Sequence, residues 1–367
     1  MDSLRVTYRV EVAAADAEAR AEVIAREQTV EVPRSVVRDA FVEQEILGRV
    51  EQIEAIGESA ALATIAYPIA TTALDPCQLV NVIFGNTSLQ RDVECLAIAL
   101  PRAVREALGG PRFGLPGLRE ALGAPTRPLT CTAVKPMGLS AKQLAELCQT
   151  FARAGIDVIK DDHGLAEHAF CPFEERVRAC LEAVRAAAEE TGHCAIYAPN
   201  LNGSPETLRR QLDFAQEAGA RAVLTSPMLI GLPSFWELCQ RHASIPMLAH
   251  PAFGGAQRIA PEALFGTLYR LLGADAVIFV SFGSRFSESP ETCRRLVDNL
   301  LDPWEPLLPS LPVPAGGITV ESAKQVIDFY GTDAMLLVGG DLQIDADAIL
   351  RRSRAFVDAV RGHHGAA

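Results

Sequence analysis

The chain has 367 residues, of which 49% are hydrophobic and 22% are charged, a composition typical of a globular protein long enough for two domains. Its formal net charge of -12 argues against a nucleic-acid partner and against binding to an anionic membrane surface. No apolar run is long enough to span a bilayer and no secretory pattern opens the chain, so we expect a cytoplasmic protein without a membrane partner. Nine cysteines without a Cys-x-x-Cys pair fit reduced thiols.

The first part of the chain predicts a small α+β domain. Alternating apolar residues predict strands over 5–12, 50–56, 61–67 and 92–100, and amphipathic stretches predict helices over 16–27 and 76–85. A turn at Gly57 separates the two middle strands. This order indicates a ferredoxin-like domain over residues 1–120. The glycine-rich and proline-rich segment 109–117 is typical of a boundary loop.

Strands and helices then alternate regularly to the end of the chain. We predict strands over 131–135, 157–162, 194–200, 222–227, 246–252, 276–283, 313–318 and 334–340. Helices are expected to begin near Ser140, Pro172, Ser204, Leu232, Ala260, Ser289, Thr319 and Asp345, several of them behind a serine or threonine N-cap. The alternation indicates a (β/α)8 TIM barrel over residues 121–367. A doubly wound sheet is the alternative, but no Gly-x-Gly-x-x-Gly motif opens its first unit.

Polar residues gather where these strands end, which is where barrels of this kind carry their active sites. Lys160 and Asp162 should share one face of their strand, because side chains alternate along a strand. Glycine pairs after the last two strands allow backbone N–H groups to approach a phosphate. A salt-bridged strand end remains the structural alternative for Lys160. The candidate residues are Lys135, Lys160, Asp162, His163, His250, Arg285, Gly316, Gly317, Gly339 and Gly340.

Several of these segments resemble the ribulose bisphosphate carboxylase (Rubisco) large chain. Lys160-Asp161-Asp162 resembles the activator-lysine motif of that chain, and Lys135 resembles its first-strand lysine. The two glycine pairs resemble its phosphate loops. Glu27 and Asn86 lie in segments similar to the active-site segments of its N-terminal domain. The resemblance implies a homodimer in which the N-terminal domain of one subunit closes over the barrel of the other. It also implies Mg²⁺ held by Asp162, by His163 at the third ligand position and by Lys160 as a carbamate, and no nucleotide cofactor.

At several positions this sequence differs from the family pattern, and these differences affect which substrate we expect. Met137 replaces a second lysine, and His163 replaces a glutamate ligand. Pro251, Ile278 and Ala315 stand where the family grips the second phosphate of a bisphosphate. We therefore expect a substrate with one phosphate and no fixation of CO₂. His163 leaves three alternatives open: a softer metal, a substrate contact, or no metal site.

The retained residues suit enolate chemistry on a monophosphorylated sugar or sugar acid. The resemblance implies that Lys135 protonates a carbanion and that Lys160 is both a metal ligand and a base. It also implies that Asn86 holds a carboxylate and that Glu27 and Arg285 contact the substrate. His250 would move a proton. This set favours decarboxylation of a 3-oxo sugar-acid phosphate of the 3-oxo-isoapionate 4-phosphate type. The alternatives are an isomerase or enolase of a 5-methylthio-pentulose 1-phosphate in methionine salvage, or a non-catalytic regulator that binds a sugar phosphate.

Overall fold

A four-stranded antiparallel sheet forms the N-terminal part of the chain. The computed structural model describes residues 3–283 and 288–362. The sheet has the order β2-β3-β1-β4, and two helices pack on it. This is the ferredoxin-like order, so the sequence prediction is confirmed. The strands are β1 (Ser3–Val10), β2 (Arg49–Ile56), β3 (Ala60–Pro68) and β4 (Val93–Ala99), and the helices are α1 (Ala17–Glu27) and α2 (Pro76–Phe84).

Alternating burial explains how this sheet forms. Leu4, Val6 and Tyr8 on β1 are fully buried, and they belong to the same core as Ile24 of α1. The start of α2 is also determined by neighbouring residues, because the Asp75 side chain accepts hydrogen bonds from the backbone N–H groups of Cys77 and Gln78 at 2.9 and 3.0 Å. Both features depend on residues that lie close together in the chain.

Eight parallel strands form the barrel, and each predicted strand is present. Backbone hydrogen bonds join them in two runs, β12-β5-β6-β7 and β11-β10-β9-β8. A parallel bridge between Asn200 and Leu224 connects β7 to β8, and β11 lies beside β12. The barrel therefore closes on itself. The strands are β5 (Leu129–Val134), β6 (Val158–Asp161), β7 (Ile196–Ala198), β8 (Val223–Thr225), β9 (Met247–Ala249), β10 (Ala276–Val280), β11 (Leu311–Ala315) and β12 (Met335–Leu337).

Helices surround these strands, mostly with the predicted starts. Ser140, Ser204 and Ser289 each cap a helix by accepting a backbone N–H bond. Thr319 was expected to cap the next one, but that helix begins at Ala323 because Thr319 and Ser322 bond to each other in a preceding turn. The helices are α5 (Ala141–Arg153), α6 (Phe173–Thr191), α7 (Pro205–Ala218), α8 (Pro227–Ile230), α9 (Leu232–Glu237), α10 (Tyr269–Leu271), α11 (Pro290–Leu301), α12 (Ala323–Tyr330) and α13 (Ile349–Arg361), with π-helical turns at Leu238–His242 and Glu262–Leu268.

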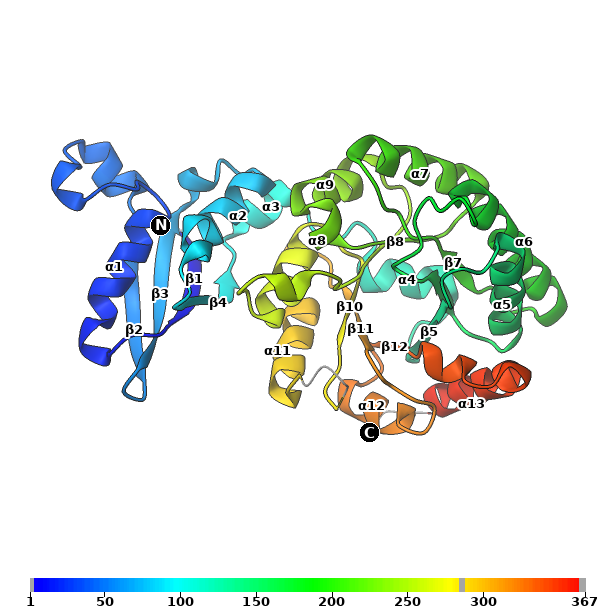
Figure 1. Cartoon of the computed structure of the whole chain (residues 1–367). Coiled ribbons are helices and arrows are strands. Elements are labelled where there is room, and N and C mark those ends of the chain that lie inside the picture. The colour runs from blue at the N-terminus through cyan, green and yellow to red at the C-terminus, as the bar shows by residue number, and fades with distance from the viewer. Residues whose placement is uncertain (1–2, 284–287, 363–367) are drawn as a thin grey trace.

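The segment expected to be a boundary loop is helical in its second half. After a short helix α3 (Arg102–Leu108) and a turn, helix α4 covers Gly114–Leu122. Leu115 and Leu118 of α4 pack on the apolar residues that fill the barrel interior, so α4 closes one end of the barrel (Figure 1). The loop prediction for 109–117 was wrong there because glycines that break isolated helices are tolerated where packing stabilises the helix. The division at residue 120 stays a prediction.

The sheet and the barrel are tied together along β4. Cys95 of β4 donates its N–H to the carbonyl of Arg258 and accepts one from Ala260. The Arg258 guanidinium also bonds the carbonyls of Val93 and Ser88, at 3.0 and 2.7 Å. Figure 1 shows the N-terminal unit, blue to cyan, beside the barrel, green to red. Within residues 3–283 and 288–362, no helix has the length and apolar character needed to cross a lipid bilayer.

Candidate active site

A cavity of about 970 Å³ opens at the carboxyl ends of the barrel strands. Nine of the residues singled out from the sequence line it, and they come from five different strand ends. Parallel strands bring their carboxyl ends to one edge, which is why residues far apart in the chain meet here. They are Lys135, Lys160, Asp162, His163, His250, Gly316, Gly317, Gly339 and Gly340.

The end of β6 divides its polar side chains between two faces, as strand geometry predicts. Lys160 and Asp162 face the cavity. Asp161 faces the surrounding helices, where it accepts hydrogen bonds from Arg176 at 2.9 Å and Tyr197 at 2.6 Å. Asp161 and Arg176 are both fully buried. The outward carboxylate thus belongs to the scaffold, and the inward pair lines the cavity.

Lys135 and Asp162 form an ion pair across the cavity floor. Burial by itself would raise the pKa of Asp162, but the Lys135 ammonium and the N–H of Gly164 outweigh it and lower that pKa below its usual range. Lys160, almost completely buried, donates to the carbonyl of Asp161 at 3.0 Å. Burial lowers the pKa of the Lys160 amine, so the neutral amine is more accessible than in an ordinary lysine.

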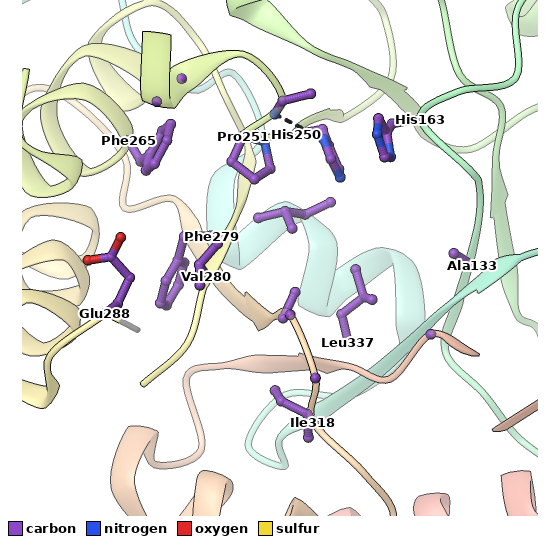
Figure 2. A pocket seen from close by; sticks show the side chains of 18 of the residues that line it. Ala133, His163, His250, Pro251, Phe265, Phe279, Val280, Glu288, Ile318 and Leu337 are labelled. Atoms are coloured by element: carbon purple, nitrogen blue, oxygen red, sulfur yellow. Dashed lines mark hydrogen bonds between the residues drawn. The ribbon is translucent and has the colours of Figure 1, made fainter. Parts of the chain in front are cut away.

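Two imidazoles stack beside these groups. The rings of His163 and His250 have centroids 4.1 Å apart and planes 13° from parallel (Figure 2). Burial and the nearby lysines lower the pKa of both rings, that of His250 well below the usual value. Nδ1 of His250 accepts the N–H of Ala252 at 3.1 Å, so the neutral ring carries its proton on Nε2. His250 is thereby a neutral hydrogen-bond donor.

The glycine pairs form one corner of the cavity. Gly316 and Gly317 have φ angles of 93° and 114°, a conformation that other residues adopt only with strain. Gly340 opens a short 3-10 helix at the end of β12. A Cβ placed on Gly339 would lie 3.9 Å from Cε of Lys135, so the lysine passes close to this corner. Backbone N–H groups and one ammonium group are suitable partners for a phosphate.

Apolar side chains form another part of the cavity lining. Phe265 and Phe279 lie there, and Pro251, Ile278 and Ala315, the replacements noted in the sequence, also line the cavity. Figure 2 shows the two phenyl rings on the side away from His163.

Three acidic residues that the sequence pattern did not single out also line the cavity. Glu94 comes from β4 of the N-terminal sheet, Glu288 lies near the phenyl rings, and Asp341 follows the last glycine pair. Only Asp341 had a sequence signal, its position directly after Gly339 and Gly340. Burial and the nearby Glu262 raise the pKa of Glu288.

Two predicted residues do not line this cavity. Asn86 donates to Glu27 at 3.1 Å on the exposed surface of the N-terminal unit. The structure therefore brings them together with each other and not with Lys160 of the same chain. Arg285 lies outside the described residues.

The expected magnesium site is incomplete without a modification. Among the described residues, no three His, Cys, Asp or Glu side chains come together as metal ligands would. Asp162 and His163 are adjacent, with Nδ1 of His163 3.8 Å from the carboxylate. A carbamate on Lys160 would add the oxygen ligands that Mg²⁺ prefers, and the lowered pKa of that lysine suits carbamate formation, which consumes a neutral amine. The donor set fits a divalent cation in this modified form only.

Comparison with known proteins agrees with this architecture. The family model for the ribulose bisphosphate carboxylase large chain, catalytic domain, matches residues 114–347. The chain is 46% identical over 358 residues to ribulose bisphosphate carboxylase-like protein 1 of Rhodopseudomonas palustris, covering 98% of this chain and 97% of that one. It is 43% identical over 362 residues to the 5-methylthioribulose-1-phosphate isomerase of Rhodospirillum rubrum, again covering 98% and 97%. A crystal structure of a Rubisco-like protein from Rhodopseudomonas palustris matches with a TM-score of 0.92 and 38% identity, covering 100% of both chains. The chain belongs to the Rubisco large-chain family, as a Rubisco-like protein of form IV.

Proposed function

We propose that this protein isomerises a 5-methylthioribulose 1-phosphate-like ketose phosphate through an enediolate. The observation that carries the proposal is the division of one cavity into a glycine-lined corner, a lysine–imidazole centre and an apolar side. The name of the Rhodospirillum rubrum relative supports the same substrate class. Decarboxylation of a 3-oxo sugar-acid phosphate, our first expectation from the sequence, has no such support.

The three parts of the cavity suit the three parts of such a substrate. A single phosphate would bind the backbone N–H groups of Gly316, Gly317 and Gly340. The carbonyl carbon and its neighbour would then lie near Lys135 and the imidazoles. An uncharged thioether end would contact the apolar side, where a second phosphate would lack a cationic partner among the described lining residues. A volume of about 970 Å³ leaves room for the whole molecule.

The proton transfers follow from the charge states of the cavity groups. Lys160, whose pKa is lowered by burial, would accept the proton from the carbon beside the carbonyl. The Nε2–H of neutral His250 would donate to the oxygen on which negative charge develops. Lys135 would return a proton to the neighbouring carbon. A divalent cation bound by Asp162, His163 and a carbamylated Lys160 would polarise the carbonyl, in which case the base would be the carbamate.

A second copy of the chain would complete this site. Glu27 and Asn86 pair on an exposed surface outside their own cavity. Large apolar side chains are exposed in the segments that follow the barrel strands at the cavity end: Met137 (50%), Phe170 (48%), Leu229 (50%), Phe253 (60%) and Ile344 (75%). We propose that the N-terminal unit of a partner covers these loops in a homodimer. A fully active monomer in light scattering coupled to chromatography would contradict this.

The test is isotope exchange on defined substrates. In D₂O, 5-methylthioribulose 1-phosphate should gain deuterium beside its carbonyl and change into an isomer, as followed by proton and phosphorus NMR. Lys160→Ala should abolish both changes, while Lys142→Ala, an exposed lysine on α5, should leave them intact. Release of CO₂ from a 3-oxo sugar-acid phosphate without exchange on the ketose would identify the decarboxylase instead. Thermal stabilisation by both compounds without turnover would identify a binding protein.

A further inference from the structure

An acidic residue borders the corner assigned to the phosphate. Asp341 directly follows Gly339 and Gly340 and lines the cavity with them. Its side chain is only 13% exposed, so water screens its charge poorly. An isolated anion at this place would repel a phosphate dianion.

The carboxylate of Asp341 has a structural role. Oδ2 of Asp341 accepts the backbone N–H of Val320 at 3.0 Å. Val320 lies in the loop that follows β11, three residues after Gly317, whereas Asp341 lies in the short 3-10 helix that follows β12. This hydrogen bond joins the two segments that carry the two glycine pairs.

Arg352 of α13 forms an ion pair with this carboxylate. Its Nη2 donates to Oδ2 of Asp341 at 2.8 Å, and its Nε donates to the backbone carbonyl of Asp341 at 3.1 Å. The guanidinium also lies 3.3 Å from Glu321, which is 70% exposed and well solvated. Arg352 itself does not line the cavity.

Other positive charge near the corner is scarce. Among the described residues that line the cavity there is no arginine, and the two lysines are Lys135 and Lys160. Lys135 is already paired with Asp162, and Lys160 is directed to a backbone carbonyl. The charge of Asp341 therefore depends on Arg352 for its compensation.

We infer that Arg352 is a positioning residue that makes this corner able to bind a phosphate, by neutralising Asp341 while Asp341 joins the two glycine loops. The inference rests on the proposed phosphate site and adds a determinant of its anion affinity. It requires that the two residues act as a pair: loss of Arg352 alone should be harmful, and loss of both charges should be tolerated.

Inorganic phosphate is the probe, titrated calorimetrically into the wild type and the variants at one ionic strength. Arg352→Met should weaken phosphate binding by roughly tenfold or more, because it leaves an uncompensated carboxylate beside the anion. Arg352→Lys should recover most of the affinity. Asp341→Asn combined with Arg352→Met should also recover it, because asparagine keeps an acceptor for Val320 without the charge. Arg354→Met, which removes an exposed arginine from the same helix, is the control for net charge.

The outcomes separate this inference from the proposed site. Phosphate affinity unchanged in Arg352→Met overturns the inference while the site stands. A double variant as weak as Arg352→Met shows that only loop structure was lost, and this also overturns it. If Gly317→Ala, strained at a φ of 114°, leaves wild-type phosphate binding unchanged, the phosphate site itself is refuted.

Discussion

Replacing Asp161 by asparagine should destabilise the barrel strongly although Asp161 does not line the cavity. Its carboxylate is fully buried and accepts hydrogen bonds from Arg176, Tyr197 and the N–H of Asn200, at 2.9, 2.6 and 3.0 Å. The asparagine would keep the size of the side chain but remove its charge. The Arg176 guanidinium, equally buried, would then lack its counter-ion.

The expected magnitude follows from that burial. Removing one partner of a buried ion pair costs about 3–5 kcal/mol, because the remaining charge stays desolvated. For a domain of the size of this barrel, each kcal/mol lowers the melting temperature by about 2–4 °C, so Asp161→Asn should lower it by roughly 6–20 °C. Removing both charges, as in Asp161→Asn with Arg176→Gln, should cost less than the single change.

Differential scanning calorimetry at neutral pH measures these shifts. Glu175→Gln removes an exposed carboxylate next to Arg176 in α6 and should change stability by no more than about 0.5 kcal/mol. A melting temperature for Asp161→Asn within about 2 °C of the wild type would refute the reasoning. So would a double variant that is as unstable as the two single changes added together.

Three further predictions concern chemistry and pH. Lys135→Met should lower turnover by about 10²–10⁴, the range for loss of a general acid, and steady-state kinetics should show a smaller change in KM; unchanged kcat with raised KM would make Lys135 a phosphate ligand. The protein should not incorporate labelled bicarbonate into phosphoglycerate from ribulose 1,5-bisphosphate, because Pro251 and Ile278 offer no second phosphate grip; incorporation above a boiled control would contradict this. Burial would raise the pKa of Asp157, but the Arg127 guanidinium outweighs it and lowers that pKa. The ionised Asp157 therefore makes its full contribution to the free energy of unfolding above its unfolded-state pKa of about 3.9, and this contribution is lost as the pH falls through the lower pKa of the folded state. The melting temperatures of the wild type and Asp157→Asn should accordingly converge on acidification below about pH 4.

Local signals determined the elements of both parts of the chain. Period-two burial in β1 and the serine caps at Ser140 and Ser204 depend on neighbours within a few residues, so the sequence alone is enough to predict them. The strand-end cluster was also predictable, because parallel strands place their carboxyl ends at one edge. Lys160 and Asp162 line the same cavity for that reason.

Long-range packing decided the rest. Helix α4 is stable because Leu115 and Leu118 cover the barrel interior, a contact that no local pattern contains. Glu27 and Asn86 meet each other and not the cavity of their own chain, since the N-terminal unit is held along β4. The charge of Asp341 is balanced by an arginine eleven residues away, on the next helix. Spacing along the chain does not encode such contacts, because they depend on how completed elements pack, and the free energy that fixes them comes from burial in the finished fold.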